Sequence, residues 1–314
     1  MTIPVLFVIG ALVSIQSKIN SELAQQLGSG LRAAALSAVI SFGSGLVLLT
    51  VIVLSHRTNR RGVAALYRGV ARGEFPVWLI LGGLAGALFV ASQGLAVGTL
   101  GVALFIVAFV AGQSTAGLLV DHHGFGPGGP RPVSVGRIIG AALAVVAVAL
   151  SAAGVGATIT GLAIAVALLP LIAGMGTSVQ QGLNGRVALR VGSWPTTFNN
   201  FLIGVIGLLV YFALSLLAPG ELVGLPRTWW LYLGGAIGLV FIWASSILVR
   251  IHGVLILSLC SIAGQVVSAI VIDLVSAPDE LTGFSYAAAA ITLAGVAIAT
   301  LLRPRPARAG TPRP

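Results

Sequence analysis

The chain has 314 residues, of which 57% are hydrophobic, 42 are glycine and only 8% are charged, with a net charge of +10. An average soluble domain carries about 25% charged residues, so this composition excludes a soluble enzyme, an intrinsically disordered chain and a nucleic-acid-binding domain. The single cysteine, Cys260, excludes an intramolecular disulfide and a cysteine-based metal site. We therefore expect a polytopic, all-α integral membrane protein.

Ten apolar runs are long enough to cross a bilayer, whose core of about 30 Å needs about 20 residues of helix. In chain order they are 3–24, 31–54, 76–97, 101–120, 136–155, 161–184, 195–217, 229–248, 253–274 and 284–302. The runs are continuous rather than alternating, which excludes a β-barrel. No Lys or Arg precedes the first run and no small-residue cleavage site follows a short apolar core, so we expect a retained helix rather than a signal peptide.

The basic residues predict the orientation of these spans. If the N-terminus is cytoplasmic, every Lys and Arg falls in a cytoplasmic segment except Lys18, Arg32 and Arg227. An excess of Lys and Arg marks the cytoplasmic side, so we predict that both termini are cytoplasmic. The charge of +10 then needs no nucleic-acid partner. A basic loop is expected over 55–75, and 303–314 is expected to be a disordered basic tail that meets anionic lipid headgroups.

The sequence contains an internal repeat. Two shifts, of 164 residues before the 55–75 loop and of 152 residues after it, align rare polar and aromatic residues: Gln16 with Gln180, Asn20 with Asn184, Trp78 with Trp230, Gln113 with Gln265, and Asp121 with Asp273. Each half holds five spans, an odd number, so the second half is expected to enter the membrane from the opposite side. Inverted five-helix repeats are typical of secondary transporters, whose substrate site lies between the halves. The predicted units are 1–156 and 157–302.

The repeated amides are candidate substrate ligands. Gln16 and Asn20 lie four residues apart and share one helical face, and Gln180 and Asn184 repeat this arrangement. An amide in hydrocarbon that lacks a hydrogen-bond partner costs roughly 2–7 kcal/mol, so both faces must point into protein or into a wet cavity. Binding a substrate and bonding helix to helix both remain open as roles.

Gln113 and Gln265 are the leading candidates for substrate contact. Each follows an Ala-Gly pair near mid-membrane, and the glycine leaves room for the amide to reach a cavity. Packing is the alternative role. Four polar or aromatic residues without a counterpart in the other half could instead select the substrate, pack, or satisfy backbone groups: Gln93, Trp243, Asn199 and Asn200.

Asp121 and Asp273 close the fourth and ninth spans, where a carboxylate opposes the helix macrodipole. One explanation is proton coupling, and the other is an ion pair with a nearby arginine such as Arg137. The absence of Asp and Glu from the central third of every span weighs against a buried carboxylate relay. The run Asp121-His122-His123 has no further ligand at metal spacing, so no metal site is expected.

Two repeated patterns of glycine, Gly82-xxx-Gly86 and Gly234-xxx-Gly238, predict close helix packing within the chain or in a homodimer. Lys18 and Glu22, four residues apart, are expected to form a local ion pair. The sequence holds no nucleotide-binding signature, so no cofactor is expected.

These residues resemble the YdcZ-like branch of the drug/metabolite transporter (DMT) superfamily. The resemblance rests on SIQSKIN at 14–20 with LGS at 27–29, on AGQ at 111–113 leading to DHHG at 121–124, and on the fainter copies SVQQGLN at 178–184 and AGQ at 263–265. Members of this branch can be five-helix proteins, and the chain looks like two of them fused. The resemblance implies a multi-pass transporter of the bacterial inner (plasma) membrane, and an exporter in particular.

The sequence thus predicts a non-enzymatic secondary transporter that moves a small polar or amphipathic metabolite by alternating access between inverted halves, as a monomer or homodimer. A flippase for a lipid or lipid precursor is the alternative within transport. An integral-membrane transferase is the alternative outside it, and only Asp121-His122-His123 offers the clustered acid and histidine groups that such an enzyme needs.

Overall fold

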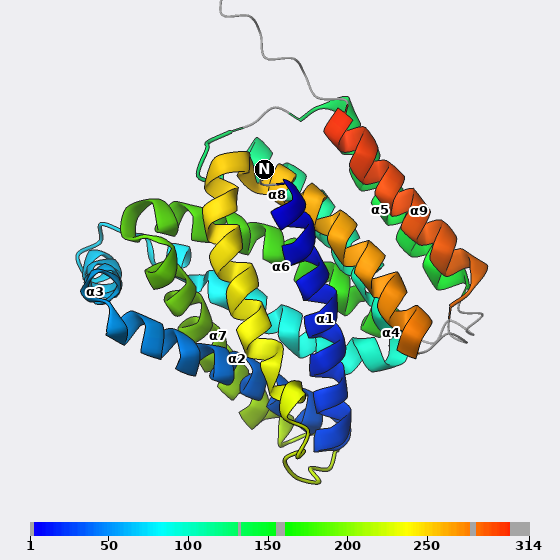
Figure 1. Cartoon of the computed structure of the whole chain (residues 1–314), viewed down its shortest axis with the longest axis horizontal. Helices are drawn as coiled ribbons and strands as arrows, with labels where there is room; N and C mark the ends of the chain where they lie inside the picture. The colour runs from blue at the N-terminus through cyan, green and yellow to red at the C-terminus, as the bar shows by residue number, and fades with distance from the viewer. Residues whose placement is uncertain (1–2, 131–132, 155–160, 277–280, 302–314) are drawn as a thin grey trace, which may run out of the picture.

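The computed structural model describes residues 3–130, 133–154, 161–276 and 281–301 (Figure 1). The elements in this part of the chain are α1 (Ile3–Leu27), α2 (Gly30–Ser55), α3 (Arg57–Ala71), the 3₁₀-helix η1 (Val77–Gly82), α4 (Gly83–His122), α5 (Val135–Gly154), α6 (Gly161–Val191), α7 (Ser193–Ser215), the 3₁₀-helix η2 (Trp229–Leu233), α8 (Gly234–Ser276) and α9 (Gly283–Leu301). The expected all-α fold is confirmed for these residues. The predicted tail, 303–314, lies outside them.

Two pairs of predicted spans follow one another without a loop between them. The runs 76–97 and 101–120 form η1 and α4, and the runs 229–248 and 253–274 form η2 and α8. α4 changes direction at Gly101, whose φ of 74° and ψ of 165° break the helix without a loop. Only glycine adopts such a conformation readily, which explains why the break occurs at this residue. In Figure 1, α8 also changes direction between its yellow and orange legs.

The predicted loop over 55–75 is mainly a helix, α3. Val63, Leu66 and Val70 recur at helical spacing, and Leu66 is fully buried against Phe75 and α6. The arginines of α3 point away from this face and are exposed. A helix with one apolar stripe and one basic face is stable only when the stripe is covered, and α6 and α7 cover it here.

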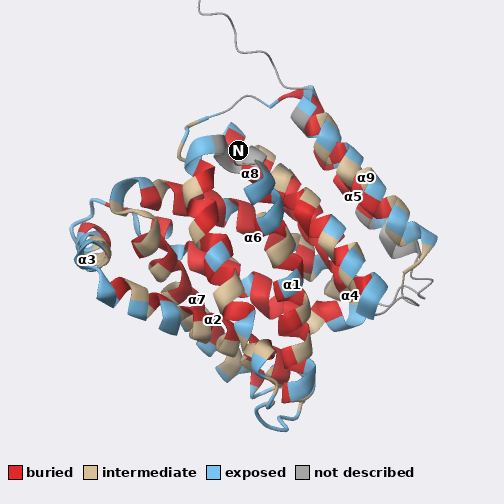
Figure 2. Cartoon of the chain, viewed as in Figure 1, coloured by how far each residue is buried: buried red, intermediate tan, exposed pale blue. Residues whose placement is uncertain are grey.

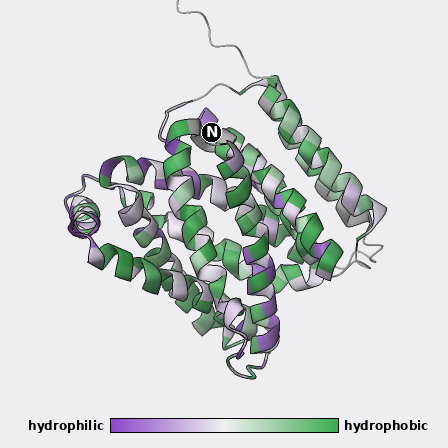
Figure 3. Cartoon of the chain, in the orientation of Figure 1, coloured by the Kyte–Doolittle hydropathy of each residue, from purple (hydrophilic) through white to green (hydrophobic). Residues whose placement is uncertain are grey.

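The outer surface is apolar, as a membrane protein requires. Five described helices are long and apolar enough to cross a membrane: Pro4–Leu27, Gly30–Ser55, Val77–His122, Ser193–Ser215 and Trp229–Ile251. Figure 3 shows hydrophobic residues over most of the helical surface, with polar residues gathered on α3 and at the lower end of α1. Exposed side chains such as Val47, Val51 and Leu54 on α2 would form an apolar patch in water. The chain is a multi-pass membrane protein.

The two halves of the sequence interlock. The main packing partners are α1 with α8, α4 with α6, α2 with α7 and α5 with α9, so each pair joins one helix from either half. The core lies where these helices meet (Figure 2). The repeat register relates the closest contacts: a Cβ on Gly264 would collide with the carbonyl of Phe7, and a Cβ on Gly112 would collide with the carbonyl of Leu171.

Candidate substrate site

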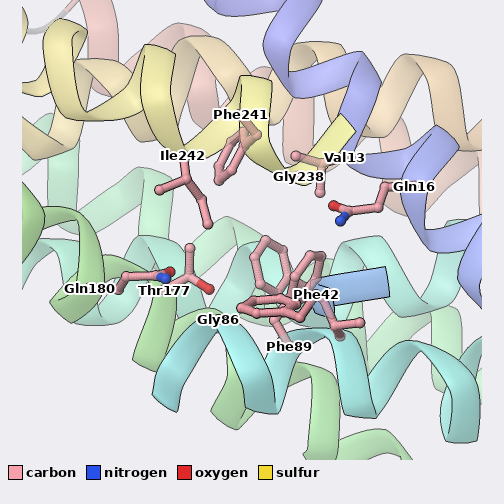
Figure 4. Close-up of a pocket in the computed structure, with 12 residues that line it drawn as sticks. Val13, Gln16, Phe42, Gly86, Phe89, Thr177, Gln180, Gly238, Phe241 and Ile242 are labelled. Carbon is pink, nitrogen blue, oxygen red and sulfur yellow. The ribbon is translucent and has the colours of Figure 1, made fainter. Parts of the chain in front are cut away.

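A small cavity lies between the two halves, at the meeting of α1, α4, α6 and α8 (Figure 4). Its volume is about 20 Å³, little more than one water molecule needs. Most of its lining consists of residue pairs that the repeat register relates, joined by Phe42 and Phe109: Val13 and Thr177, Gln16 and Gln180, Gly86 and Gly238, Phe89 and Phe241, and Val90 and Ile242. Both halves of the sequence therefore contribute matching residues to the cavity.

The described lining combines phenyl rings with two amides and holds no charged side chain. Gln16 and Gln180 flank the central rings from opposite sides in Figure 4. The glycines of the repeated patterns make room for these amides. A Cβ on Gly86 would lie 2.6 Å from Nε2 of Gln180, and a Cβ on Gly238 would lie 2.5 Å from Nε2 of Gln16.

We call the side of the molecule that holds the α1–α2 turn the α1–α2 end. A hydrogen-bonded network closes the cavity toward this end. Nδ2 of Asn20 donates to Oε1 of Gln93 over 2.6 Å, and Nε2 of Gln93 donates to Oγ of Ser17 over 2.9 Å. Nε2 of Gln16 donates to the carbonyl of Gly234 over 2.9 Å. All four side chains are buried, so each bond replaces water that the interior excludes.

A different network closes the cavity toward the α6–α7 turn, the α6–α7 end. Oδ1 of Asn200 accepts from Nε2 of Gln180 at 3.0 Å and from Nδ2 of Asn184 at 3.1 Å. The sequence left substrate selection, packing and the satisfaction of backbone groups open for Asn200, and the structure bonds its side chain to two amides of α6. Because Asn200 has no counterpart in the first half, the repeat comparison could not have found this role.

Asn199 extends the closure of the α6–α7 end to α3. Its Nδ2 donates to the carbonyl of Ile80 in η1, and its Oδ1 accepts from the hydroxyl of Tyr67, each over 2.9 Å. One of the roles left open for Asn199, the satisfaction of a backbone group, is therefore met at the carbonyl of Ile80. Burial raises the pKa of Tyr67, so the hydroxyl stays protonated and donates throughout the neutral range. Tyr67 was missed because it falls in a predicted loop.

Gln113 and Gln265 occupy equivalent positions beside the close glycine contacts, and neither lines the described cavity. Ser178 Oγ donates to the carbonyl of Gln113 over 2.6 Å, and Ser14 Oγ donates to that of Gln265 over 2.7 Å. Both glutamines are fully buried. The side-chain amide of Gln113 has no hydrogen-bond partner among the described residues, so its role as a substrate contact stays a prediction.

Trp243 stacks on Trp194, with ring centroids 5.0 Å apart, and is not part of the cavity lining. At the α1–α2 end, Lys18 and Glu22 form the expected ion pair at 3.2 Å. The side chain of Arg137, the suggested partner of Asp121, lies outside the described residues. The stacking of Trp243 on Trp194 favours packing as the role of Trp243.

Asp273 caps the second leg of α4. Its carboxylate accepts from the backbone N–H of Val102 at 3.2 Å and from that of Ala103 at 2.6 Å. The break at Gly101 leaves these N–H groups without acceptors inside the helix, and an anion is favoured at a helix N-terminus. Asp273 lies near the C-terminus of α8, where it opposes the dipole of its own helix, but it stabilises the N-terminus of the second leg of α4. Asp121, its counterpart in the register, is buried.

Comparison with known families identifies the family of the chain. The profile of the DMT_YdcZ family, described as "Putative inner membrane exporter, YdcZ", matches residues 1–150 and 165–298. The chain belongs to this family. The resemblance drawn from the amide and Gly-Gln motifs is thereby confirmed, and the YdcZ family supports a transporter role for the chain.

Seven chains among solved structures are similar to this member of the YdcZ family. One, described as "Crystal structure of protein", aligns over 95% of this chain and 97% of that chain, with a TM-score of 0.56 and 18% sequence identity. At that identity the likeness shows a shared fold alone. No curated protein matches the chain.

Proposed function

We propose that the protein is a secondary transporter of the bacterial inner membrane that exports small uncharged or amphipathic solutes. In this proposal the two halves are inverted repeats that alternate access to the cavity between them. The observation that carries the proposal is the cavity itself, because its lining comes in register-related pairs from both halves. Such a site at the repeat interface is the usual arrangement in transporters built from inverted repeats.

The proposed topology has ten crossings with both termini in the cytoplasm. The segment Val77–His122 has 46 residues, or roughly 69 Å of helix at about 1.5 Å per residue. That length exceeds two bilayer cores of about 30 Å, so two crossings that meet at Gly101 fit it. The α6–α7 end carries Arg186, Arg190 and the arginines of α3, whereas the α1–α2 end carries few cations. This charge bias supports a cytoplasmic α6–α7 end.

The two amide networks supply the proposed gates. Opening toward the outside would separate Asn20 from Gln93, and opening toward the cytoplasm would separate Asn200 from Gln180 and Asn184. Each opening frees amide donors and acceptors that a solute can engage in their place. With both networks formed, the cavity of about 20 Å³ is too small for a metabolite, so transport requires one of them to open.

The lining also suggests the class of solute. A net charge moved into a site with no described countercharge would carry a large desolvation cost, whereas phenyl rings and amides suit an apolar body with a few polar groups. Gln113 and Gln265 remain proposed secondary contacts. Asp121 and Asp273 remain the acids proposed for any proton coupling.

The test is transport by the purified protein in liposomes, across a panel of metabolites and labelled lipids, with and without a proton gradient. Gln16→Ala and Gln180→Ala should each lower solute flux about tenfold, the effect of losing roughly 1–2 kcal/mol of hydrogen bonding. Gln26→Ala is the matched control, because Gln26 lies on the same helix as Gln16 and is exposed.

Unchanged flux in both cavity variants would remove the site. Lipid movement without solute flux would replace the proposal by the flippase alternative. Asp121→Asn should alter the dependence of flux on the proton gradient if this acid couples protons, and an unaltered dependence would exclude that role.

A further inference from the structure

A cleft that combines two arginines with apolar side chains lies at the α6–α7 end, away from the cavity. It is lined by Pro76, Trp78, Leu79, Arg186, Leu189 and Arg190, and its volume is about 290 Å³. Arg186 and Arg190 are four residues apart on α6, so their side chains share one face of the helix, and both residues line this cleft. Nothing in the proposed transport cycle uses this cleft.

The two arginines are held in place without a described carboxylate partner. Arg186 donates to the carbonyl of Gly124 and lies over the ring of Phe125. Arg190 lies 4.7 Å from the ring centroid of Phe75. Among the described residues, no Asp or Glu side chain comes within 4.0 Å of either guanidinium group. The ion pairs in this part of the chain are Lys18–Glu22 and Arg72–Glu74, and neither involves Arg186 or Arg190. A guanidinium has five N–H donors, so donors remain for an anion.

The opposite end of the molecule lacks this arrangement. In the repeat register Arg186 corresponds to Glu22 and Arg190 to Gln26, and Glu22 is paired with Lys18. The pair of cations is therefore specific to the α6–α7 end. The exposed arginines of α3, which packs against α6, add to the positive field there.

The cleft adjoins an apolar groove. Phe125, whose ring meets that of Trp78 edge-on at 6.2 Å, also lines a groove of about 400 Å³ with Leu119, Ile172 and Val179. Both hollows are bordered by α6. Trp78 is 42% exposed, and a partly exposed tryptophan is typical of headgroup depth. A ligand that fills both hollows needs an anionic head and an apolar tail.

We propose that this cleft binds the phosphate headgroup of an anionic lipid of the cytoplasmic leaflet, with an acyl chain in the adjoining groove. Arg186 and Arg190 donate to the phosphate, and Trp78 and Leu189 pack beside the glycerol region. A free phosphate ion would use the arginines and leave the apolar groove unoccupied, which is why the charge and the groove together favour a lipid.

The experiment measures lipid binding to the full-length protein in detergent by native mass spectrometry, with phosphatidylglycerol as the probe and phosphatidylcholine as the neutral comparison. One arginine near a membrane surface changes anionic-lipid affinity about fivefold. The double substitution Arg186→Gln/Arg190→Gln should therefore weaken phosphatidylglycerol binding roughly 20-fold to 30-fold. Arg227→Gln, which removes an exposed charge at the other end, should leave binding unchanged.

The arginine variants would also lose binding if they misfolded, and Leu189→Glu separates the two causes. It places a negative charge in the cleft while keeping both arginines. It should weaken phosphatidylglycerol binding clearly more than Leu189→Gln, which alters the same packing contact without adding a charge. Inorganic phosphate at millimolar concentration should fail to displace the lipid. Wild-type affinity in the double variant, an equal loss in Arg227→Gln, or displacement by inorganic phosphate would each overturn the proposal.

Discussion

The two ends of the molecule are closed by connections that are equivalent in the repeat but differ in chemistry. At the α1–α2 end, the segment 216–228 pairs its backbone with the turn: Ser29 N–H donates to the carbonyl of Glu221 and Val223 N–H to that of Leu27. At the α6–α7 end, α3 covers the turn through side chains, with Tyr67 bonded to Asn199 and Gly62 against Pro195. Side chains also contribute at the α1–α2 end, where Arg32 donates to the carbonyls of Ala218 and Leu216. The backbone pairing with the turn is therefore what distinguishes this end from the other.

The largest difference between the ends should come from their turn glycines, Gly28 and Gly192, which the repeat register aligns. Gly192 has φ 90° and ψ 166°, and a Cβ there would meet Cδ of Pro195 at 3.9 Å, an ordinary van der Waals contact. Gly192→Ala should therefore cost about 1–3 kcal/mol for backbone strain alone. Gly28 has φ 147° and a Cβ there would also collide with the carbonyl of Glu221. Gly28→Ala should therefore cost about 1–3 kcal/mol more.

The measurement is the thermal unfolding midpoint in detergent micelles, with Gly43→Ala as the control. A Cβ on Gly43 meets nothing within 4 Å, so this helical substitution should be neutral or stabilising. Equal losses in Gly28→Ala and Gly192→Ala would show that the backbone pairing at the α1–α2 end adds no steric demand.

The next effect separates the two amide networks. Asn20→Leu removes the described donor to Oε1 of Gln93, a buried acceptor, and should cost about 1–3 kcal/mol. Asn184→Leu should cost less, because Oδ1 of Asn200 still accepts from Gln180. Unfolding midpoints of the two variants, measured side by side, test the order; a larger loss in Asn184→Leu would contradict the assigned bonds.

Tyr67→Phe tests the side-chain closure of the α6–α7 end. It removes one hydrogen bond, worth about 0.5–1.5 kcal/mol, and keeps the ring packed beside Leu66. Amide hydrogen exchange in α3 should quicken while exchange in α1 stays as it was. Exchange that is unchanged in α3 would mean that packing alone holds this helix.

The smallest effect is expected for Glu221→Ala. The side chain of Glu221 is exposed, and its backbone makes the bonds to the turn, so stability should stay within about 0.5 kcal/mol of wild type. The unfolding midpoint again provides the check. A clear loss would show that the side chain of Glu221 also holds the α1–α2 end.

The sequence was informative wherever a residue was rare for its surroundings. Polar amides in apolar helices led to the repeat, and Gln16 and Gln180 do line the cavity between the halves. The amphipathic spacing of Val63, Leu66 and Val70 was readable too, but the basic residues around it favoured a loop.

Other features depend on contacts between distant segments. The role of Asp273 follows from the break at Gly101, which brings unbonded N–H groups to the end of a helix some 170 residues away in sequence. The partners of Asn200 likewise come from α6. Local pattern and composition carry no information on such pairings, so they could not have been predicted.

The interlocking of the halves has a consequence for synthesis. α1 is made first, yet its main partner, α8, begins only at Gly234, about two hundred residues after α1 ends. At about 5–20 residues per second, the ribosome delivers that partner roughly 10–40 s later. During this interval the polar face of α1 must be sheltered by its neighbours in the first half, by water or by the insertion machinery. During synthesis, α1 therefore lacks its main packing partner until α8, the second-last α-helix described, has been made.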